Sequence, residues 1–452
     1  MNRLLNSAAA AAPGAAGGRG GAAGATAQAA RPSRVELPNA LVVILHENHS
    51  NPTVAIQGLV KAGAIFDPPR LGGLSGFVAA MLDRGTETRT AYEQAEALES
   101  LGASLSFESG PETITVSGNA LSQDLAVVLS VLADALGRPG LAPDQIEKAR
   151  DELIVRVKIS NENTAYVASR AANEILYPSD HPYHRPPIGT EDSLRAVTRE
   201  DLAEFHATHY GPNTAVLVLA GDVDPESTIE DVRRSFLDWP KLELPPPFAV
   251  PAAPTPERPE RRVVHMKGKS QMDVVCALPG IARTDPEYYA VMLANFVLGG
   301  GSLSSRLMDN LRDKQGLVYG VYSTLNAGIG AGPIQIRAGT NPANADRTAD
   351  EILKQVSRLH AEGPNETELE EAVSYLTGVF PVRLETNSGV ASQLLGAELY
   401  GLGMDFIERY PAIIRGVTLE ETLAAGRKYL RPTAHALALA GSYPEPARAG
   451  GD

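Results

Sequence analysis

The stretch of sequence that decides the fold is Gly73-Leu-Ser-Gly-Phe-Val-Ala-Ala-Met-Leu-Asp-Arg-Gly-Thr86. It reads as one helix, and its most informative feature is what three of its positions lack. Gly76, Ala79 and Ala80 lie at i, i+3 and i+4, a spacing that places side chains about one turn apart on a helix. None of the three supplies a lone pair for a metal or a group that takes up a proton. These three positions therefore supply neither a metal ligand nor a general base.

The missing chemistry is defined by comparison with zinc peptidases of the inverted-zincin type. In those enzymes an H-x-x-E-H run puts two imidazoles on one helix face, beside a glutamate that acts as general base. The letters found here, Gly-Leu-x-x-Phe followed by Met-Leu-x-x-Gly-Thr, resemble the active-site helix of the pitrilysin or insulinase family of zinc metallopeptidases. The resemblance implies that Gly76 and Ala80 hold the two histidine positions and Ala79 the position of the base.

The resemblance also implies a third zinc ligand, a glutamate on a later helix. Counting the family's interval from Ala80 leads to Arg156. An arginine cannot ligate zinc and repels it. Glu152, one turn earlier, is the nearest carboxylate, and we interpret it as a solvated helix residue. We therefore expect no metal and no other cofactor in this chain, and expect zinc only in a partner subunit.

Composition narrows the classes of partner. The formal net charge of −14 argues against nucleic acid or an anionic membrane surface as the main partner. No apolar run approaches the roughly 18 residues that a membrane helix needs. The only cysteine, Cys276, lies in a mostly apolar run, so we expect a buried and inert thiol.

Two breaks in composition divide the chain. Residues 1–33 are rich in alanine and glycine and lack acids, which predicts a disordered arm. Residues 244–260 are rich in proline and predict a semi-rigid linker. They separate an N-terminal half, 34–243, from a C-terminal half, 261–445. Because the arm has no continuous apolar stretch of the secretory kind, we expect a cytoplasmic protein, with a periplasmic or organellar location as alternatives.

The two halves look like copies of one another. At an ungapped offset of 220 residues, Val197-Thr198 recurs as Val417-Thr418, and Leu217-x-Leu-Ala-Gly221 recurs as Leu437-x-Leu-Ala-Gly441. In each half a helix leads through a proline into an apolar strand that glycine closes. This pattern indicates a duplication rather than a short solenoid repeat.

Strand-like runs alternate with amphipathic helices within each half, which predicts an α+β fold with helices packed on one face of each sheet. The resemblance implies two homologous insulinase-like halves, each a tandem α/β sandwich, that form a clamshell around a chamber. The predicted strands, hairpin and helices are Leu41–Leu45, Thr53–Val60, Ala103–Gly118, Leu125–Leu136, Arg262–Met266, Asp273–Leu278, Glu287–Leu298, Leu303–Arg312, Tyr319–Leu325 and Ile334–Ala338.

The strongest positive signal is Leu311-Arg-Asp-Lys-Gln-Gly-Leu-Val-Tyr319. It resembles an arginine and tyrosine pair of the insulinase family, which the resemblance places across from the zinc-bearing half. The fork of Arg312 suits a peptide carbonyl, and the phenol of Tyr319 suits the oxyanion of a tetrahedral intermediate. The structural alternative is an arginine that favours a helix C-terminus and a tyrosine that packs at a strand start.

Other candidate motifs are weaker. His46 and His49 lie at H-x-x-H spacing on a turn without a third ligand nearby, so solvent-facing histidines are the better interpretation. His206 and His209, which precede Tyr210, are expected to pack on the following strand. His181 is expected to serve the fold. Gly299-Gly-Gly-Ser302 lacks the rest of a phosphate-binding loop.

These observations predict a non-catalytic subunit of a heterodimeric insulinase-type zinc metallopeptidase, inactive alone. Arg312 and Tyr319 would serve a related, H-x-x-E-H-bearing subunit, and the substrate would be a peptide held between the two chains. The alternative is a structural scaffold or assembly subunit without a role in proteolysis. A stand-alone peptidase with relocated ligands is a third possibility, disfavoured by the loss of every ligand position.

Overall fold

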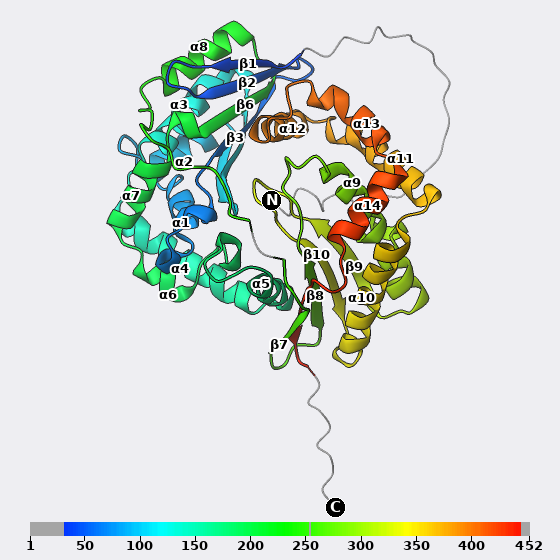
Figure 1. Ribbon diagram of the computed structural model, residues 1–452. Coiled ribbons are helices and arrows are strands. Elements are labelled where there is room, and N and C mark those ends of the chain that lie inside the picture. Colours follow the sequence, from blue (N-terminus) through cyan, green and yellow to red (C-terminus); the bar gives the residue numbers. More distant parts are fainter. Residues whose placement is uncertain (1–30, 253–254, 444–452) are drawn as a thin grey trace, which may run out of the picture.

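A computed structural model describes residues 31–252 and 255–443. Helices and strands form two bodies, each built on one mixed β-sheet (Figure 1). Most of the predicted disordered arm lies outside the described residues, but Ser33 already begins the first strand. A membrane-crossing helix, long and apolar throughout, does not occur among the described residues.

The first sheet has six strands in the order β1-β2-β6-β3-β5-β4. Neighbouring strands are antiparallel except β2 and β6, which run parallel. Their bounds are β1 Ser33–Glu36, β2 Val42–Glu47, β3 Thr53–Val60, β4 Ser104–Ser109, β5 Ile114–Leu121 and β6 Ala215–Gly221.

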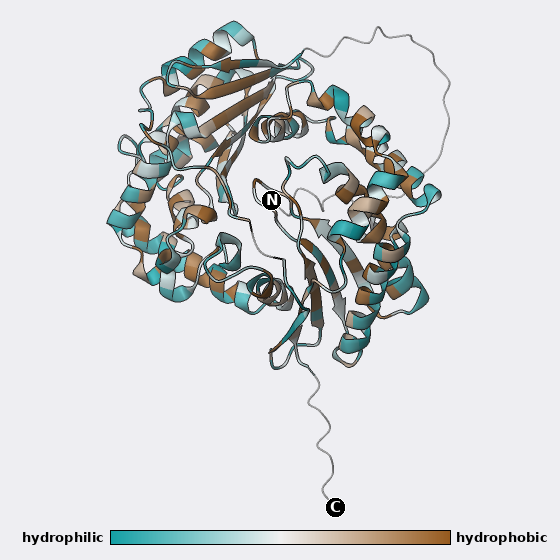
Figure 2. Cartoon of the chain, in the orientation of Figure 1, coloured by the Kyte–Doolittle hydropathy of each residue, from teal (hydrophilic) through white to brown (hydrophobic). Residues whose placement is uncertain are grey.

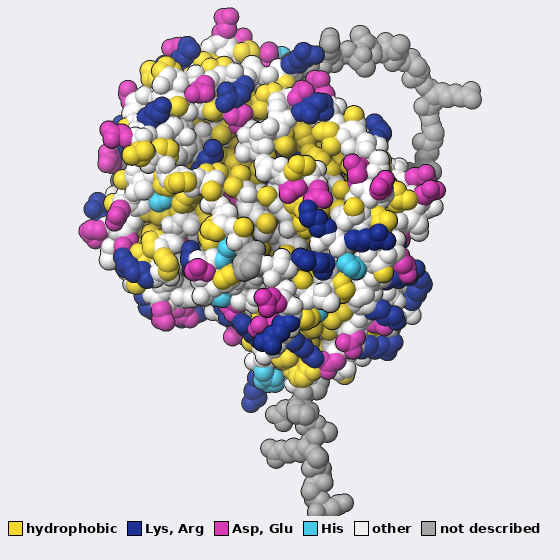
Figure 3. All heavy atoms as spheres, in the orientation of Figure 1, with side chains coloured by type: hydrophobic (Ala, Val, Ile, Leu, Met, Phe, Trp, Pro, Cys, Tyr) yellow, Lys and Arg dark blue, Asp and Glu magenta, His cyan; other side chains and the backbone are white. Residues whose placement is uncertain are grey.

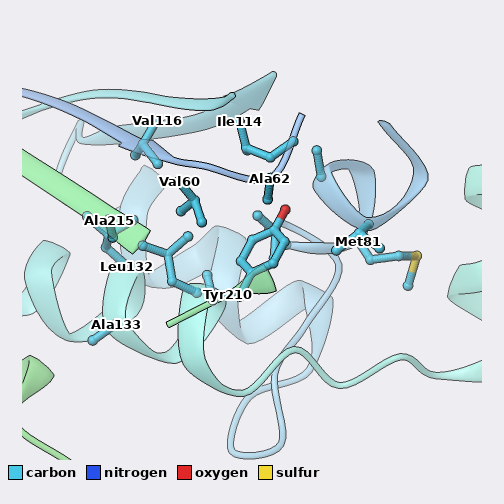
Figure 4. Close-up of a cluster of buried hydrophobic side chains, with 14 of the residues drawn as sticks. Val60, Ala62, Met81, Ile114, Val116, Leu132, Ala133, Tyr210 and Ala215 are labelled. Atoms are coloured by element: carbon cyan, nitrogen blue, oxygen red, sulfur yellow. The ribbon is translucent and has the colours of Figure 1, made fainter. Parts of the chain in front are cut away.

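Helices cover one face of this sheet and form its main core. Their bounds are α1 Leu74–Met81, α2 Ala91–Glu99, α3 Leu125–Gly137, α4 Pro143–Asn161, α6 Glu191–Ala196, α7 Arg199–His209 and α8 Pro225–Phe236. Figure 2 shows that hydrophobic residues concentrate on the strands and on the helix faces turned toward them. Figure 4 shows Tyr210 projecting into this core among Val60, Ala62 and Ile114.

The second sheet has five strands in the order β7-β11-β8-β10-β9. The strands are β7 Glu260–His265, β8 Met272–Leu278, β9 Val318–Leu325, β10 Ile334–Thr340 and β11 Ala436–Gly441. Its main covering helices are α9 Tyr288–Asn295, α10 Ala345–Glu362, α11 Glu366–Arg383, α13 Phe406–Gly416 and α14 Leu419–Tyr429. Cys276 is buried on β8, and burial raises the pKa of its thiol to about 12.

The two sheets share one topology. The order β2-β6-β3-β5-β4 of the first matches β7-β11-β8-β10-β9 of the second, with β1 as an extra edge strand. In both sheets the parallel pair occupies the same place, β2 with β6 and β11 with β7. The offset of 220 residues therefore reflects equivalent elements, with α7 and β6 corresponding to α14 and β11.

The sequence prediction of helices on one face of each sheet is incomplete, because the other face is also covered. Helix α5, Thr164–Leu176, packs on β8 and β11 of the second sheet. Helix α12, Asn387–Leu399, packs on β6 and β3 of the first. Each body thus lends one helix to the other (Figure 1). The spacing of apolar residues predicts which side of a helix is buried, but it does not predict which sheet that side packs on.

Two further segments differ from a simple reading of the pattern. The described parts of the predicted linker, 244–252 and 255–259, contain no helix or strand. They nevertheless pack on the first body: Phe248 stacks on Phe66, and the Pro251 carbonyl lies 2.9 Å from Nε2 of His181. The predicted helix Leu303–Arg312 is instead a short 3₁₀ turn followed by a π-helix, Met308–Lys314.

Candidate degenerate active site

Helix α1 begins at a buried carboxylate. Oδ2 of Asp67 accepts a hydrogen bond of 2.7 Å from the Gly73 N–H, and Oδ1 accepts one of 2.8 Å from the Ser75 N–H. Burial raises the pKa of the Asp67 carboxyl to about 6, although these donors act in the opposite direction. Gly73 has φ +90°, and a Cβ there would lie 2.9 Å from the Ile188 carbonyl oxygen. Glycine is therefore required at this helix start.

The three degenerate positions lie on α1 as the sequence spacing predicts. Gly76 and Ala80 are half-buried, one turn apart, whereas Ala79 is only 3% exposed. A Cβ at Gly76 would meet only the Cβ of Ser109, at 3.8 Å, so there is room for a side chain at its base. The face of α1 that carries Gly76 and Ala80 is therefore partly accessible, and neither residue has a side chain that could bind a metal.

Arg156 is the residue that the resemblance places at the third ligand position. Arg156 is exposed on α4 and has no ion pair among the described residues. Glu152, one turn earlier, is exposed and accepts a hydrogen bond of 2.5 Å from Nη2 of Arg84. The Nε of Arg84 donates to the Ala80 carbonyl at 3.0 Å, so this arginine joins the end of α1 to α4. With no lone pair at Gly76, Ala80 or Arg156, these residues do not fit a zinc ion.

The histidines serve packing and hydrogen bonding. Among the residues that the structure describes, no three His, Cys, Asp or Glu side chains converge as a metal site. His49 faces solvent as predicted and lies 2.7 Å from Asp222. The same prediction is wrong for His46, which is half-buried on β2, where burial lowers its pKa. His206 and His209 stack on Tyr210 and Phe205, and burial lowers the pKa of both.

Arg312 lies in the last turn of the π-helix Met308–Lys314, with its side chain exposed. Its carbonyl accepts a 3.0 Å hydrogen bond from Gly316, which has φ +61° and ends the helix in the left-handed conformation. No side-chain hydrogen bond or ion pair of Arg312 occurs among the described residues. Its place near a helix C-terminus fits the structural alternative as well as the functional one.

Tyr319 is the second residue of β9 and is 94% exposed. Strand β9 is an edge of the second sheet, and the register with β10 shifts beside Tyr319, between Ala338 and Thr340. A tyrosine packed at a strand start, the structural alternative for this residue, is therefore wrong. The phenol is presented to solvent at a β-bulge, a device that re-aims side chains at functional edges.

The structure brings the sequence-predicted residues together in two groups. Gly76, Ala79 and Ala80 share α1, and Arg312 and Tyr319 share the turn from the π-helix into β9. Among described residues, no hydrogen bond or ion pair joins one group to the other. Figure 3 shows the molecule in the orientation of Figure 1. On the face in view there is a hollow between the two bodies, and hydrophobic side chains gather in it.

Sequence reasoning missed two residues that hold α1 in place. Asp67 directly precedes Pro68, and an acidic residue ahead of a proline is a signal for capping a helix start. That signal was available for Asp67, although the capped helix begins only at Leu74. Arg84 carried no such signal, because its partner Glu152 lies on a distant helix.

Comparisons with known proteins agree with this description. The profile of the insulinase family (peptidase family M16) matches residues 42–186, and the profile of the peptidase M16 inactive domain matches residues 196–376. An uncharacterized zinc protease of Streptomyces coelicolor is 25% identical over 405 residues, which cover 88% of this chain and 87% of that protein. A protein of Helicobacter pylori described as a non-peptidase homolog is 24% identical over 400 residues, covering 87% and 90%.

Among solved structures, a peptidase M16 inactive domain from Pseudomonas fluorescens shares the fold with a TM-score of 0.84. It is 24% identical, and the match covers 92% of this chain and all of that one. Together the two profiles reach into both bodies and cover residues 42–186 and 196–376. The chain belongs to the insulinase (M16) family of peptidases.

Proposed function

We propose that this protein is the non-catalytic subunit of a two-chain insulinase-type zinc metallopeptidase. Its partner is a related chain that carries the H-x-x-E-H helix and therefore the zinc and the general base. This chain supplies Arg312 and Tyr319 to a peptide held between the two subunits. The two bodies that exchange α5 and α12 form one half of the resulting clamshell, and the chamber lies between the chains.

The observation that carries the proposal is an asymmetry between the two groups of residues. Gly76, Ala79, Ala80 and Arg156 have lost every function of the zinc site. Tyr319, in contrast, is 94% exposed on an edge strand, where packing gives no reason to keep an aromatic residue. An exposed phenol and an exposed arginine seven residues apart are suited to a substrate that approaches from outside the chain.

The chemistry of the two side chains matches what the partner's site lacks. A guanidinium offers a fixed fork of N–H donors, which suits the carbonyl oxygens of a peptide backbone. A phenol donates a hydrogen bond to the negative oxygen that develops when a peptide carbonyl is attacked. Neither role requires a metal or a base in this chain.

The test is reconstitution with the H-x-x-E-H-bearing relative from the same genome. Each chain alone and the equimolar mixture are assayed with internally quenched peptides, and zinc is measured by elemental analysis after chelator dialysis. We expect one zinc per mixed complex, in the partner, and cleavage only by the mixture. A mixed complex that forms but cleaves no faster than the partner alone would favour the scaffold function instead.

A further inference from the structure

Helix α5 leaves part of the second sheet uncovered. The helix packs on Val275 and Ala277 of β8 and on the alanines of β11, and it reaches β10 at Gln335, which donates a hydrogen bond of 2.7 Å to Asn173 of α5. Arg337 of β10 pairs with Val275 on one side and with Tyr322 of β9 on the other. These residues therefore share the face on which α5 lies. We call Arg337, Tyr322 and Thr324 the open strip (Figure 1, β9 and β10).

Arg337 lies in the open strip without a carboxylate. Its Nη2 donates to Oε1 of Gln335 at 2.5 Å, and its Nε is buried without a hydrogen-bond partner in the part of the chain that the structure describes. The acid that the register brings closest on β8 is Asp273, two residues from Val275. Asp273 instead accepts hydrogen bonds from Thr164 at 2.5 Å and from Gln271 at 3.1 Å. No ion pair of Arg337 occurs within the described residues.

Other arginines near α5 are treated differently. Arg262 on β7 forms an ion pair of 2.7 Å with Glu174 of α5, and Arg170 of α5 pairs with the same glutamate at 3.3 Å. Arg262 and Arg170 thus share the carboxylate of Glu174, whereas Arg337 has no such partner among the described residues. A carboxylate bound at the guanidinium of Arg337 would supply the negative charge that the described residues do not give it.

Tyr322 gives the open strip a second polar group. It lies directly across from Arg337 and is 42% exposed, and no hydrogen bond of its hydroxyl occurs among the described residues. Because the Nε is buried, the fork that can meet the two oxygens of a carboxylate is the one formed by the two terminal Nη groups. A phenol beside that fork can donate a further hydrogen bond to the same group.

We propose that Arg337, with Tyr322 opposite it, is a receptor for a carboxylate of the bound peptide. The proposal rests on the proposed function in one respect, that the ligand is a peptide. The carboxylate belongs to an acidic side chain or to the peptide C-terminus, and the two sources share the same chemistry. Arg337 would thus select peptides, whereas Arg312 and Tyr319 would act on the bond that is cleaved.

The test measures binding by the full chain without any partner or turnover. The chain is immobilised and presented with pools of fluorescein-labelled decapeptides, randomised except for a fixed central Glu or Gln, each with a free or an amidated C-terminus. We expect the wild-type chain to retain carboxylate-bearing peptides about tenfold better than their neutral counterparts. Loss of retention on Glu-to-Gln exchange identifies a side chain as the source, and loss on amidation identifies the C-terminus.

The variants assign this preference to the open strip. Arg337→Gln should abolish it, Arg337→Lys should keep only part of it because lysine has no fork, and Tyr322→Phe should weaken it. The matched control is Arg347→Gln, since Arg347 also donates to a glutamine, Gln315 at 2.8 Å, but is exposed on α10. Equal preference in wild type and in folded Arg337→Gln, or no carboxylate preference in wild type, would overturn the proposal. Because retention is measured without a zinc subunit or turnover, failure of this test is distinct from failure of the proposed two-chain peptidase.

Discussion

The side-chain carboxylate of Glu112 accepts a hydrogen bond of 3.0 Å from the backbone N–H of Gly330, which lies 218 residues further along the chain. Its second oxygen accepts one of 2.9 Å from the N–H of Ile329, and the Tyr183 hydroxyl donates to the carboxylate as well. Glu112 lies in the β4–β5 hairpin of the first body, whereas Ile329 and Gly330 lie in the β9–β10 hairpin of the second. One buried carboxylate therefore fastens the two bodies together beside the strand that carries Tyr319.

Glu112→Gln should loosen this junction. An amide has a single acceptor oxygen, so at least one of the three hydrogen bonds is lost, and a bond to a charged group contributes about 1.5–3 kcal/mol. Hydrogen exchange followed by mass spectrometry should show faster exchange of Ile329 and Gly330 in the variant. Glu108→Gln, an exposed glutamate on the neighbouring strand, is the control and should leave the exchange unchanged. Unaltered protection in Glu112→Gln would show that other contacts hold the bodies.

Asp67 should make the chain less stable as pH rises from about 4 to about 6. Its pKa is 3.8 ordinarily and is raised to about 6 by burial in the folded chain. In this window the folded state holds a proton that the unfolded state has released, so the free energy of unfolding falls as pH rises. The loss amounts to about 3 kcal/mol, complete above the folded pKa.

Urea unfolding at pH 4 and at pH 6.5 checks this expectation. The wild-type chain should lose about 2 kcal/mol more between the two pH values than Asp67→Asn does, because the interval covers most but not all of the titration. Asp405→Asn is a control of opposite sign, because the hydrogen bond from Arg409 lowers the pKa of Asp405. The same pH dependence in wild type and Asp67→Asn would show that folding does not raise the pKa of Asp67.

Restoring the zinc-helix residues should not restore zinc. The triple variant Gly76→His, Ala79→Glu, Ala80→His still has Arg156 at the third ligand position, where its charge repels the metal. Ala79 is only 3% exposed, so a glutamate there must also displace packed neighbours, at about 1–3 kcal/mol. Elemental analysis after chelator dialysis should find no stoichiometric zinc in the triple variant or in wild type.

The comparator for this experiment adds Arg156→Glu to the triple variant. If the interval from Ala80 identifies the third ligand correctly, any gain in zinc appears only with this fourth substitution. Near-equimolar zinc in the wild-type chain, together with chelator-sensitive cleavage of peptides, would contradict its assignment as a non-catalytic member.

Much of the fold was predictable because local pattern determines local structure. The strand Thr53–Val60 and the helix ending at Gly137 follow from apolar spacing and from glycine at the helix end. The duplication follows from identities at a constant offset. That Gly76 and Ala80 cannot bind a metal follows from their identities alone, once the segment is seen to resemble the family's zinc-binding helix.

Contacts between distant segments were not predictable in this way. Ala168 of α5 and Ala391 of α12 are completely buried, and their spacing predicts a helix with one apolar stripe. Nothing in that spacing tells that the stripe packs on the sheet of the other body. Glu112, which follows Pro111 in a hairpin, likewise reads as an ordinary turn residue until Gly330 is placed beside it.

The central claim, that Arg312 and Tyr319 act in trans, is tested most directly by the turnover of the reconstituted pair. Arg312→Ala and Tyr319→Phe are each combined with the wild-type zinc subunit, and kcat is measured with a quenched peptide. The controls are Arg415→Ala, an exposed arginine in the last turn of α13, and Tyr375→Phe, a tyrosine that is 53% exposed on α11.

An oxyanion donor is worth about 10²–10³ in turnover, whereas an exposed side chain contributes under roughly 1 kcal/mol to folding. We therefore predict that Arg312→Ala and Tyr319→Phe each lower kcat at least about tenfold, with complex formation and Tm nearly unchanged, and that the two controls lower neither. Wild-type kcat in a complex that carries both substitutions would contradict the account and leave the scaffold function in its place.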